Sequence, residues 1–240
     1  MHRLHEVPAP RTLTSMSGLA TLTVQIGEAE VRVIAADASA MTLAAVSVSL
    51  ETLSPHPGWA EQRPDDWWTA LRQALSALAR EVAVGDIAEL RVESARHASV
   101  FLDGERDVIR PAILAGDQRA SAEAAEIERS LGHSLEGPAA SHLLWMRRNQ
   151  AIAFKRVRRL LSPKGYLRFL LTGDLAFDAG DAAATGLFDA GSGDWSEATC
   201  DALEISMEIL PPVRAVPRPM ALLEHAAAAL GLMPGISVIG

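Results

Sequence analysis

A carboxylate, an amide and a guanidinium stand next to one another at Asp117, Gln118 and Arg119. They follow a short apolar strand expected over residues 112–114 and a small Ala-Gly turn, just before a helical pattern begins. In an α/β fold the carboxyl ends of strands hold ligands, so Asp117 is a candidate for binding a polar small molecule. The competing interpretation is that Asp117 caps the following helix, a common role for aspartate at a helix start.

The other reactive side chains give no second site. Cys200 is the only cysteine and falls in an expected helix with no histidine nearby, which favours a packed thiol. His133, His142 and His225 lack the spacing of metal ligands, so no metal site is expected from them. The glycines between residues 186 and 193 do not lead a strand into a helix, so no dinucleotide-binding loop is indicated.

Composition narrows the class of protein. The 240 residues are nearly half apolar and carry a net charge of −8 with a pI near 5.4, which argues against nucleic acid as the main partner. A single cysteine makes a reducing cytoplasm the default location. Residues 1–18 have no apolar core segment, so we expect a flexible tail and no signal peptide, and no apolar run is long enough to suggest a membrane span.

The first half of the chain opens with alternating polarity. Three consecutive antiparallel strands are expected over residues 22–26, 30–35 and 41–50. A Pro- and Gly-containing loop leads to Asp65 and Asp66, which open a helix at the end that the helix dipole favours for acidic residues. The spacing of its apolar residues predicts one buried face, formed by Trp68, Leu71, Leu75, Leu78 and Val82.

The remainder alternates between strand and helix patterns. Further strands are expected over residues 87–92, 98–102, 108–114 and 236–239, with a turn at 103–106. Helices are expected over residues 120–131, 141–148, 151–161, 164–171, 196–205 and 220–230. Residues 174–194 are expected to be irregular and residues 211–219 an extended linker. No internal repeat is present, and the pattern predicts one layered α/β domain.

Several motifs in one order carry a resemblance to a known family. They are residues 56–62 (His-Pro-Gly-Trp-Ala-Glu-Gln), 66–68 (Asp-Trp-Trp) and 110–119 (Arg-Pro-Ala-Ile-Leu-Ala-Gly-Asp-Gln-Arg), followed by 143–145, 163–173, 178–185 and 210–213. In this order they resemble the N-terminal domain of the FGGY carbohydrate kinases, and among these most closely the xylulokinases. The resemblance runs without a break from about residue 19 to residue 240.

The resemblance implies a single ribonuclease H-like lobe, the α/β fold of actin-like ATPases, with a mixed sheet and flanking helices over residues 19–240. Members of the family pair two such lobes and bind a ketose or polyol, such as a pentulose, between them. They transfer the γ-phosphoryl group of ATP to a sugar hydroxyl with the help of Mg²⁺. The resemblance implies that residues 1–240 do not include the second, nucleotide-binding lobe.

Four residues take roles from the resemblance. Asp117 matches the carboxylate that hydrogen-bonds the sugar, although Ala115 and Gly116 stand where the family has Trp-Asn. His97 falls where xylulokinases have the histidine of a Gly-Gln-Met-His loop, and the competing interpretation is a solvated surface histidine. Trp59 could flank the sugar, or belong to the core. Gly27 is what remains of the phosphate-approaching Asp-x-Gly-Thr turn.

Two departures from the family pattern predict that the chain lacks catalytic and metal-binding residues of its own. Gln25 replaces the aspartate that works with Mg²⁺, and Glu28 puts a negative charge where the family has a hydroxyl. The final strand stops before the turn that carries the general-base aspartate, and an apolar strand edge is expected there that needs a cover. One interpretation is a sugar-binding lobe completed by a companion chain or a homodimer. The other is a pseudokinase, a non-catalytic sugar-binding or protein-interaction module.

A basic stretch offers a third possibility. Positive charge is concentrated at Arg147, Arg148, Lys155, Arg156, Arg158 and Arg159. Such a stretch can dock an acidic partner, but charged helix faces are more often simply solvated.

Overall fold

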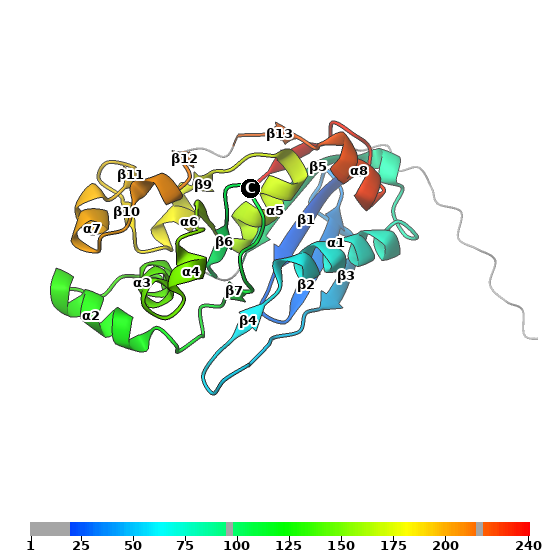
Figure 1. Cartoon of the computed structure of the whole chain (residues 1–240). Helices are drawn as coiled ribbons and strands as arrows, with labels where there is room; N and C mark the ends of the chain where they lie inside the picture. Colours follow the sequence, from blue (N-terminus) through cyan, green and yellow to red (C-terminus); the bar gives the residue numbers. More distant parts are fainter. Residues whose placement is uncertain (1–19, 95–97, 215–217) are drawn as a thin grey trace, which may run out of the picture.

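A six-stranded mixed sheet organises the computed structural model, which describes residues 20–94, 98–214 and 218–240 (Figure 1). The strand order is β13-β14-β5-β1-β2-β3. Strands β1 (Ala20–Ile26), β2 (Glu30–Ala36) and β3 (Thr42–Ser49) form the predicted antiparallel meander. Strand β5 (Ile87–Ser94) lies parallel to β1, which makes the sheet mixed, as predicted.

The two faces of this sheet differ in polarity. On β1, Leu22, Val24 and Ile26 are buried, whereas the alternate residues point to the other face and are only half buried. Helices α1 (Pro64–Leu78), α5 (Pro163–Thr172) and α8 (Glu224–Leu230) contact one another, with α1 packed on β2 and β3 and α5 packed on β5. These helices therefore cover the apolar face, and the polar face carries threonine, glutamine and charged side chains.

Helix α1 differs from the prediction in its phase. The fully buried tryptophan is Trp67, while Trp68 is only half buried, and the helix ends at Leu78, before Val82. The reason is polar as well as steric: the indole N–H of Trp67 donates to Oε1 of buried Gln62 at 2.9 Å. An inward-facing indole needs such a partner, and hydrophobic spacing alone does not reveal it.

The middle of the chain contains one predicted helix that is wrong. Residues 151–161 form the short helix α4 (Ala151–Phe154) and then the strand β8 (Arg159–Leu161). Strand β8 pairs with β6 (Val100–Leu102), and this long-range pairing overrides the local helical pattern. The neighbouring helices α2 (Ser121–Leu131) and α3 (Ala139–Asn149) agree with the sequence.

The last part of the chain holds several short elements. The stretch expected to be irregular contains β9 (Phe177–Asp178), α6 (Ala179–Ala183) and β10 (Phe188–Asp189), the last paired with β11 (Asp194–Trp195). The chain continues through α7 (Glu197–Ala202) and the 3₁₀ turn η2 (Met207–Ile209), and β12 (Val213–Arg214) pairs with β9. An earlier 3₁₀ turn, η1 (Val84–Asp86), precedes β5.

The expected open edge at the final strand is also wrong. Strand β14 (Ser237–Ile239) lies parallel to β5 on one side and antiparallel to β13 (Met220–Ala221) on the other. A helix is expected from the sequence over residues 220–230, but residues 220–221 form β13 and helix α8 begins only at Glu224. Because β13 covers β14, no strand of another molecule is required there. None of the helices in the described ranges is long and apolar enough to cross a membrane.

Candidate functional site

Four charged side chains are buried together beside the main sheet. The short strands β4 (Glu61–Gln62) and β7 (Ala112–Ile113) pair antiparallel and bring Glu61 next to the segment from Arg110 to Arg119. The side chains of Asp117 and Arg119 are 0% exposed, and those of Glu61 and Arg110 are 7% and 9% exposed. We call Glu61, Arg110, Asp117 and Arg119 the charge network.

Asp117 is held by partners from within the chain. Oδ2 accepts from the backbone N–H of Ala60 at 2.6 Å and from Nη2 of Arg119 at 2.6 Å. Oδ1 accepts from the backbone N–H and from Nε of Arg119, both at 2.8 Å. Burial opposes ionisation, but the hydrogen bonds from Arg119 and Ala60 outweigh it and lower the pKa of Asp117. The carboxylate is therefore charged and fully engaged at neutral pH.

The remaining charges of the network are paired as well. Nη1 of Arg119 lies 2.6 Å from Oε1 of Glu61, which also forms an ion pair with Nη2 of Arg110. Arg110 donates through Nη1 to Oε1 of Gln150 at 2.7 Å. Two acids and two bases thus balance in a site that excludes water, as buried charges require.

Two tryptophans enclose the network. The guanidinium carbon of Arg119 lies 3.7 Å from the ring centroid of Trp59 and 5.1 Å from that of Trp145. The two rings meet edge to face at 5.3 Å. A guanidinium over an indole is a favourable cation–π arrangement, so the aromatic walls stabilise Arg119 where solvent cannot.

This geometry places two of the predicted site residues. Asp117 belongs to the charge network and Trp59 packs against it, and neither lines the hollows described next. The helix-cap interpretation of Asp117 is wrong, because α2 begins after Ala120 with no side-chain cap. A direct contact from Asp117 to a sugar stays a prediction, and it would require Arg119 to release the carboxylate.

Gly27 lies between two hollows at the carboxyl ends of β1 and β5. One is narrow, with a volume of about 10 Å³ that holds little more than a water molecule, and is bounded by the hairpin turn, by Ser94 and Ala98, and by Leu114 and Ala115 just after β7. The other has a volume of about 300 Å³, and its polar walls are Gln25, Glu30, Arg32 and Glu93. Ile26, Gly27 and Ser94 line both. We call them the inner hollow and the outer hollow.

The hairpin turn at Gly27 is fixed by buried hydrogen bonds. The N–H of Gly27 donates to the carbonyl of Glu30 at 2.9 Å. The carbonyl of Glu28 accepts from Nε2 of Gln62 at 2.5 Å, and the same amide also holds Trp67. Gln62 therefore ties the turn to the start of α1. A Cβ at Gly27 would lie 3.2 Å from the carbonyl oxygen of Glu30, so the glycine suits the tight turn.

The predicted site residue His97 lies outside the described residues, as does the expected tail over residues 1–18. Its described neighbours Ser94 and Ala98 both line the inner hollow. The described parts of three segments that the sequence singled out, namely Gly27, Ser94 with Ala98, and Ala115, therefore line the same hollow.

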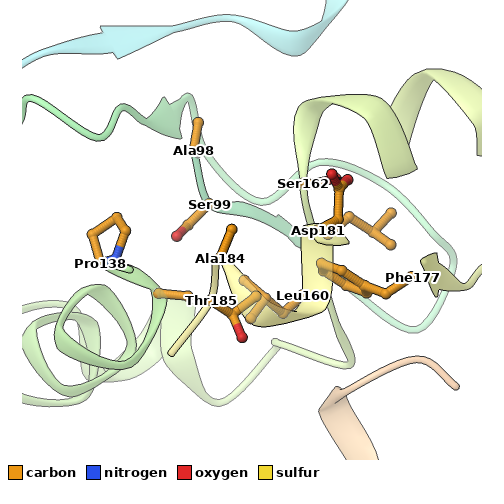
Figure 2. Close-up of a pocket in the computed structure, with 11 residues that line it drawn as sticks. Ala98, Ser99, Pro138, Leu160, Ser162, Phe177, Asp181, Ala184 and Thr185 are labelled. Carbon is orange, nitrogen blue, oxygen red and sulfur yellow. The ribbon is translucent and has the colours of Figure 1, made fainter. Parts of the chain in front are cut away.

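A separate pocket lies on the far side of Ala98. It has a volume of about 20 Å³ and is lined by Ser99, Ser162 and Thr185 together with apolar side chains such as Leu160 and Phe177 (Figure 2). Ser162 caps α5 and donates to Asp181 at 2.5 Å. Its hydroxyl groups have partners within the chain, which is typical of a packed polar cavity.

Sequence reasoning missed the buried histidine behind this pocket. Nδ1 of His142 lies 2.9 Å from Oγ of Ser99, and both residues are 1% exposed. Burial, with a further contribution from Arg119 and Arg110, lowers the pKa of His142 to about 3, so the ring is neutral. Its position in a helical run of buried residues, directly after buried Ser141, was the available signal.

The other reactive groups give no metal centre. The described residues contain no group of three or more histidine, cysteine, aspartate or glutamate side chains that could hold a metal ion. Cys200 is buried, as predicted, and burial raises the pKa of its thiol to about 11. A protonated, buried thiol is inert.

The basic stretch is largely neutralised within the chain. Arg148 forms a bidentate pair with Glu126 at 2.7 and 2.8 Å, and Arg156 pairs with Asp103 at 2.7 Å. Arg147 and Arg159 donate to backbone carbonyls at Leu203 and Glu208 respectively. These contacts favour the solvated-face interpretation over a docking surface.

Comparisons with known proteins agree with this architecture. Residues 20–240 match the FGGY family of carbohydrate kinases, N-terminal domain. The xylulose kinase of Escherichia coli (strain K12) is 33% identical over 196 residues, covering 78% of this chain and 40% of the relative. That of Bacillus subtilis (strain 168) is 30% identical over 225 residues, covering 88% and 44%. The chain thus spans less than half the length of these relatives.

Solved structures show the same fold. The xylulose kinase from Rhodospirillum rubrum superposes with a TM-score of 0.85 at 27% identity, over 92% of this chain and 49% of that one. A kinase from Brucella ovis described as a xyloylose kinase gives 0.82 at 29% identity, over 92% and 48%. The expected actin-like ATPase fold is confirmed. The sheet, the hairpin at Gly27 and the match over nearly all described residues lead to one conclusion: this chain belongs to the FGGY family of carbohydrate kinases and corresponds to its N-terminal domain.

Proposed function

We propose that residues 19–240 form the sugar-side lobe of a xylulose-kinase-like phosphotransferase of the cytoplasm. Together with a nucleotide-binding lobe, this lobe would support transfer of the γ-phosphoryl group of ATP to a hydroxyl of a ketose or polyol, with a pentulose as the first substrate to test. The observation that carries the proposal is the meeting of three family-like segments around the inner hollow, directly beside Gly27.

The two hollows suit a transfer reaction because they share a boundary. A sugar held against the segments that line the inner hollow would present a hydroxyl to the outer hollow, where the family pattern places metal and phosphates. Phosphoryl transfer depends on positioning and charge neutralisation, so adjacency of the two sites is the main structural requirement. Gly27, Ile26 and Ser94 provide that adjacency.

Sugar binding is tested on the chain itself by calorimetric titration with xylulose, using xylose as the aldose control. Ala115 lines the inner hollow, so Ala115→Arg should weaken xylulose binding at least tenfold by placing a long charged side chain where the sugar would lie. Ala38→Arg is the matched control, because Ala38 is exposed in the β2–β3 turn. Equal affinities of wild type and both variants would place the sugar elsewhere.

Catalysis is tested by adding a polypeptide that carries an FGGY C-terminal domain. ATP consumption in a coupled assay should then depend on xylulose and on both polypeptides. No activity across a panel of ketoses and polyols would contradict the phosphotransferase part of the proposal while leaving sugar binding intact.

A second candidate function is a non-catalytic module that binds sugar or another protein. The sequence at the hairpin favours it, because Gln25 is neutral where the family has a carboxylate and Glu28 is acidic where it has a hydroxyl. Tight binding of Mg-ATP by the chain alone would count against this candidate.

A further inference from the structure

Three polar side chains lie side by side on the polar face of the sheet, at one rung, meaning one set of residues paired across neighbouring strands. In the strand register Gln25 of β1 lies opposite Glu93 of β5 on one side and opposite Arg32 of β2 on the other. All three line the outer hollow. Nε2 of Gln25 donates to Oε2 of Glu93 at 3.1 Å. A carboxylate is therefore present one strand away from the position where the family pattern has one.

The donor set of the outer hollow fits a magnesium ion. Mg²⁺ keeps several waters and is bound in phosphotransferases through one or two carboxylates plus the substrate phosphates, not by an all-protein cage. Glu93 and Glu30 supply two carboxylates in this hollow, and Gln25 adds an amide. Arg32 adds a positive charge on the same rung that can face phosphate oxygens. The hollow, at about 300 Å³, leaves room for bound water.

We infer that Glu93 supplies the anionic metal ligand of this chain, in place of the carboxylate missing at Gln25. The inference rests on the proposed function and extends it to the metal. The hydrogen bond from Gln25 orients the carboxylate of Glu93, so the neutral side chain acts as a positioning residue for its charged neighbour. The expectation that the chain has no metal-binding residue followed from Gln25 and Glu28 in the hairpin, because sequence does not show which residue of β5 lies beside Gln25.

The geometry of parallel strands allows a carboxylate on β5 to take the place of one on β1. Residues on one rung of neighbouring strands point to the same face, about 5 Å apart, so a longer side chain on β5 can reach the space beside β1. Glu93 is also the next-to-last residue of β5, at the carboxyl end where α/β sheets hold ligands. Both strand ends meet at Ser94 and Gly27, which join the two hollows.

The test uses Mn²⁺ as a paramagnetic substitute for Mg²⁺, added to the isotope-labelled chain without nucleotide. Amide signals of residues 25–30 and 92–94 should broaden selectively in the wild type. Glu93→Gln should remove this broadening or raise the Mn²⁺ dissociation constant at least tenfold. Glu89→Gln is the matched control: Glu89 lies on the same strand and face but pairs with Arg91 at 2.5 Å, and its variant should behave as wild type.

A double variant tests whether Mn²⁺ binding depends on a carboxylate in this hollow, whichever of the two strands carries it. Gln25→Asp combined with Glu93→Gln moves the carboxylate back to β1 and should restore Mn²⁺ broadening at the same residues. Absence of selective broadening in the wild type, its persistence in Glu93→Gln, or no rescue in the double variant would each overturn the inference. The xylulose titration of Ala115→Arg is independent of this result, so failure of the metal site and failure of sugar binding are distinguishable.

Discussion

The charge network and the outer hollow both contain charged side chains close to the same hairpin, yet they differ in solvent exposure and in the pairing of their charges. The network is closed: Asp117 and Arg119 have no exposed side-chain area and their charges are paired inside the chain. In the outer hollow Glu93 and Arg32 are exposed, and a single 3.1 Å hydrogen bond links Glu93 to Gln25.

This difference separates stability from binding. Charges that are desolvated and mutually satisfied contribute to the folded state only while every partner is present. Charged side chains that face water keep their bound water in the folded state, and a ligand can replace this water at a small cost in free energy. Substitutions in the network should therefore change the free energy of unfolding, whereas substitutions in the outer hollow should change ligand affinity.

The largest effect is expected for Arg119→Met. The variant keeps an apolar chain against Trp59 but leaves Asp117 and Glu61 buried without their main counter-charge. We expect a loss of about 3–5 kcal/mol in the free energy of unfolding. Urea denaturation measures it, with Arg91→Met as the exposed control, which should change it by less than about 0.5 kcal/mol. Equal effects of the two substitutions would show that the network is not a stabilising unit.

A second test replaces Asp117 by Asn and follows stability against pH. The folded-state pKa of Asp117 is lowered, so its contribution is present above the unfolded value of about 4 and is lost as the pH falls below it. The variant should be less stable at pH 7 by about 2–3 kcal/mol and should lose less further stability on acidification. Parallel curves for the two proteins below pH 4 would contradict a charged Asp117.

His142 provides an effect in a different pH window. Its folded pKa of about 3 lies below the unfolded value, so the unfolded chain binds one more proton between the two values. Stability should fall with decreasing pH from about 6.5, by up to about 1.4 kcal/mol per pH unit. His142→Asn, which keeps a polar partner for Ser99, should flatten the curve between pH 4 and 6. A curve that keeps its slope there would assign the proton to another group.

Sequence patterns predicted the fold well wherever one local signal decided the outcome. The β1–β3 meander shows period-two alternation, and α5 is bounded by Ser162, Pro163 and Gly173, whose φ is +75°. Prediction failed where a distant partner decided: β8 depends on β6, β13 depends on β14, and the inward turn of Trp67 depends on Gln62. Local periodicity carries no information about such partners.

The candidate site shows the same division. Family-like motifs identified the segments at Gly27, residues 94–98 and Ala115, and the structure brings their described parts together. Sequence could not show that the carboxylate of Asp117 is paired with Arg119, because this ion pair depends on how the two side chains are buried in the folded chain. Nor could it show that Glu93 shares a rung with Gln25, because strand register follows from packing of the whole sheet.

The smallest effect is expected at Gly27, on the boundary of the two hollows. A Cβ there would lie 3.2 Å from the carbonyl oxygen of Glu30, which is tight but can be relieved by a small shift. Gly27→Ala should therefore cost less than about 1 kcal/mol in the free energy of unfolding. Gly137→Ala is the informative contrast, because its Cβ would stand 1.7 Å from the carbonyl oxygen of Ala184, and it should cost considerably more. If Gly27→Ala instead destabilised as much as Gly137→Ala, the hairpin would be part of the packed core, and the separation of a stabilising network from an open binding corner would fail.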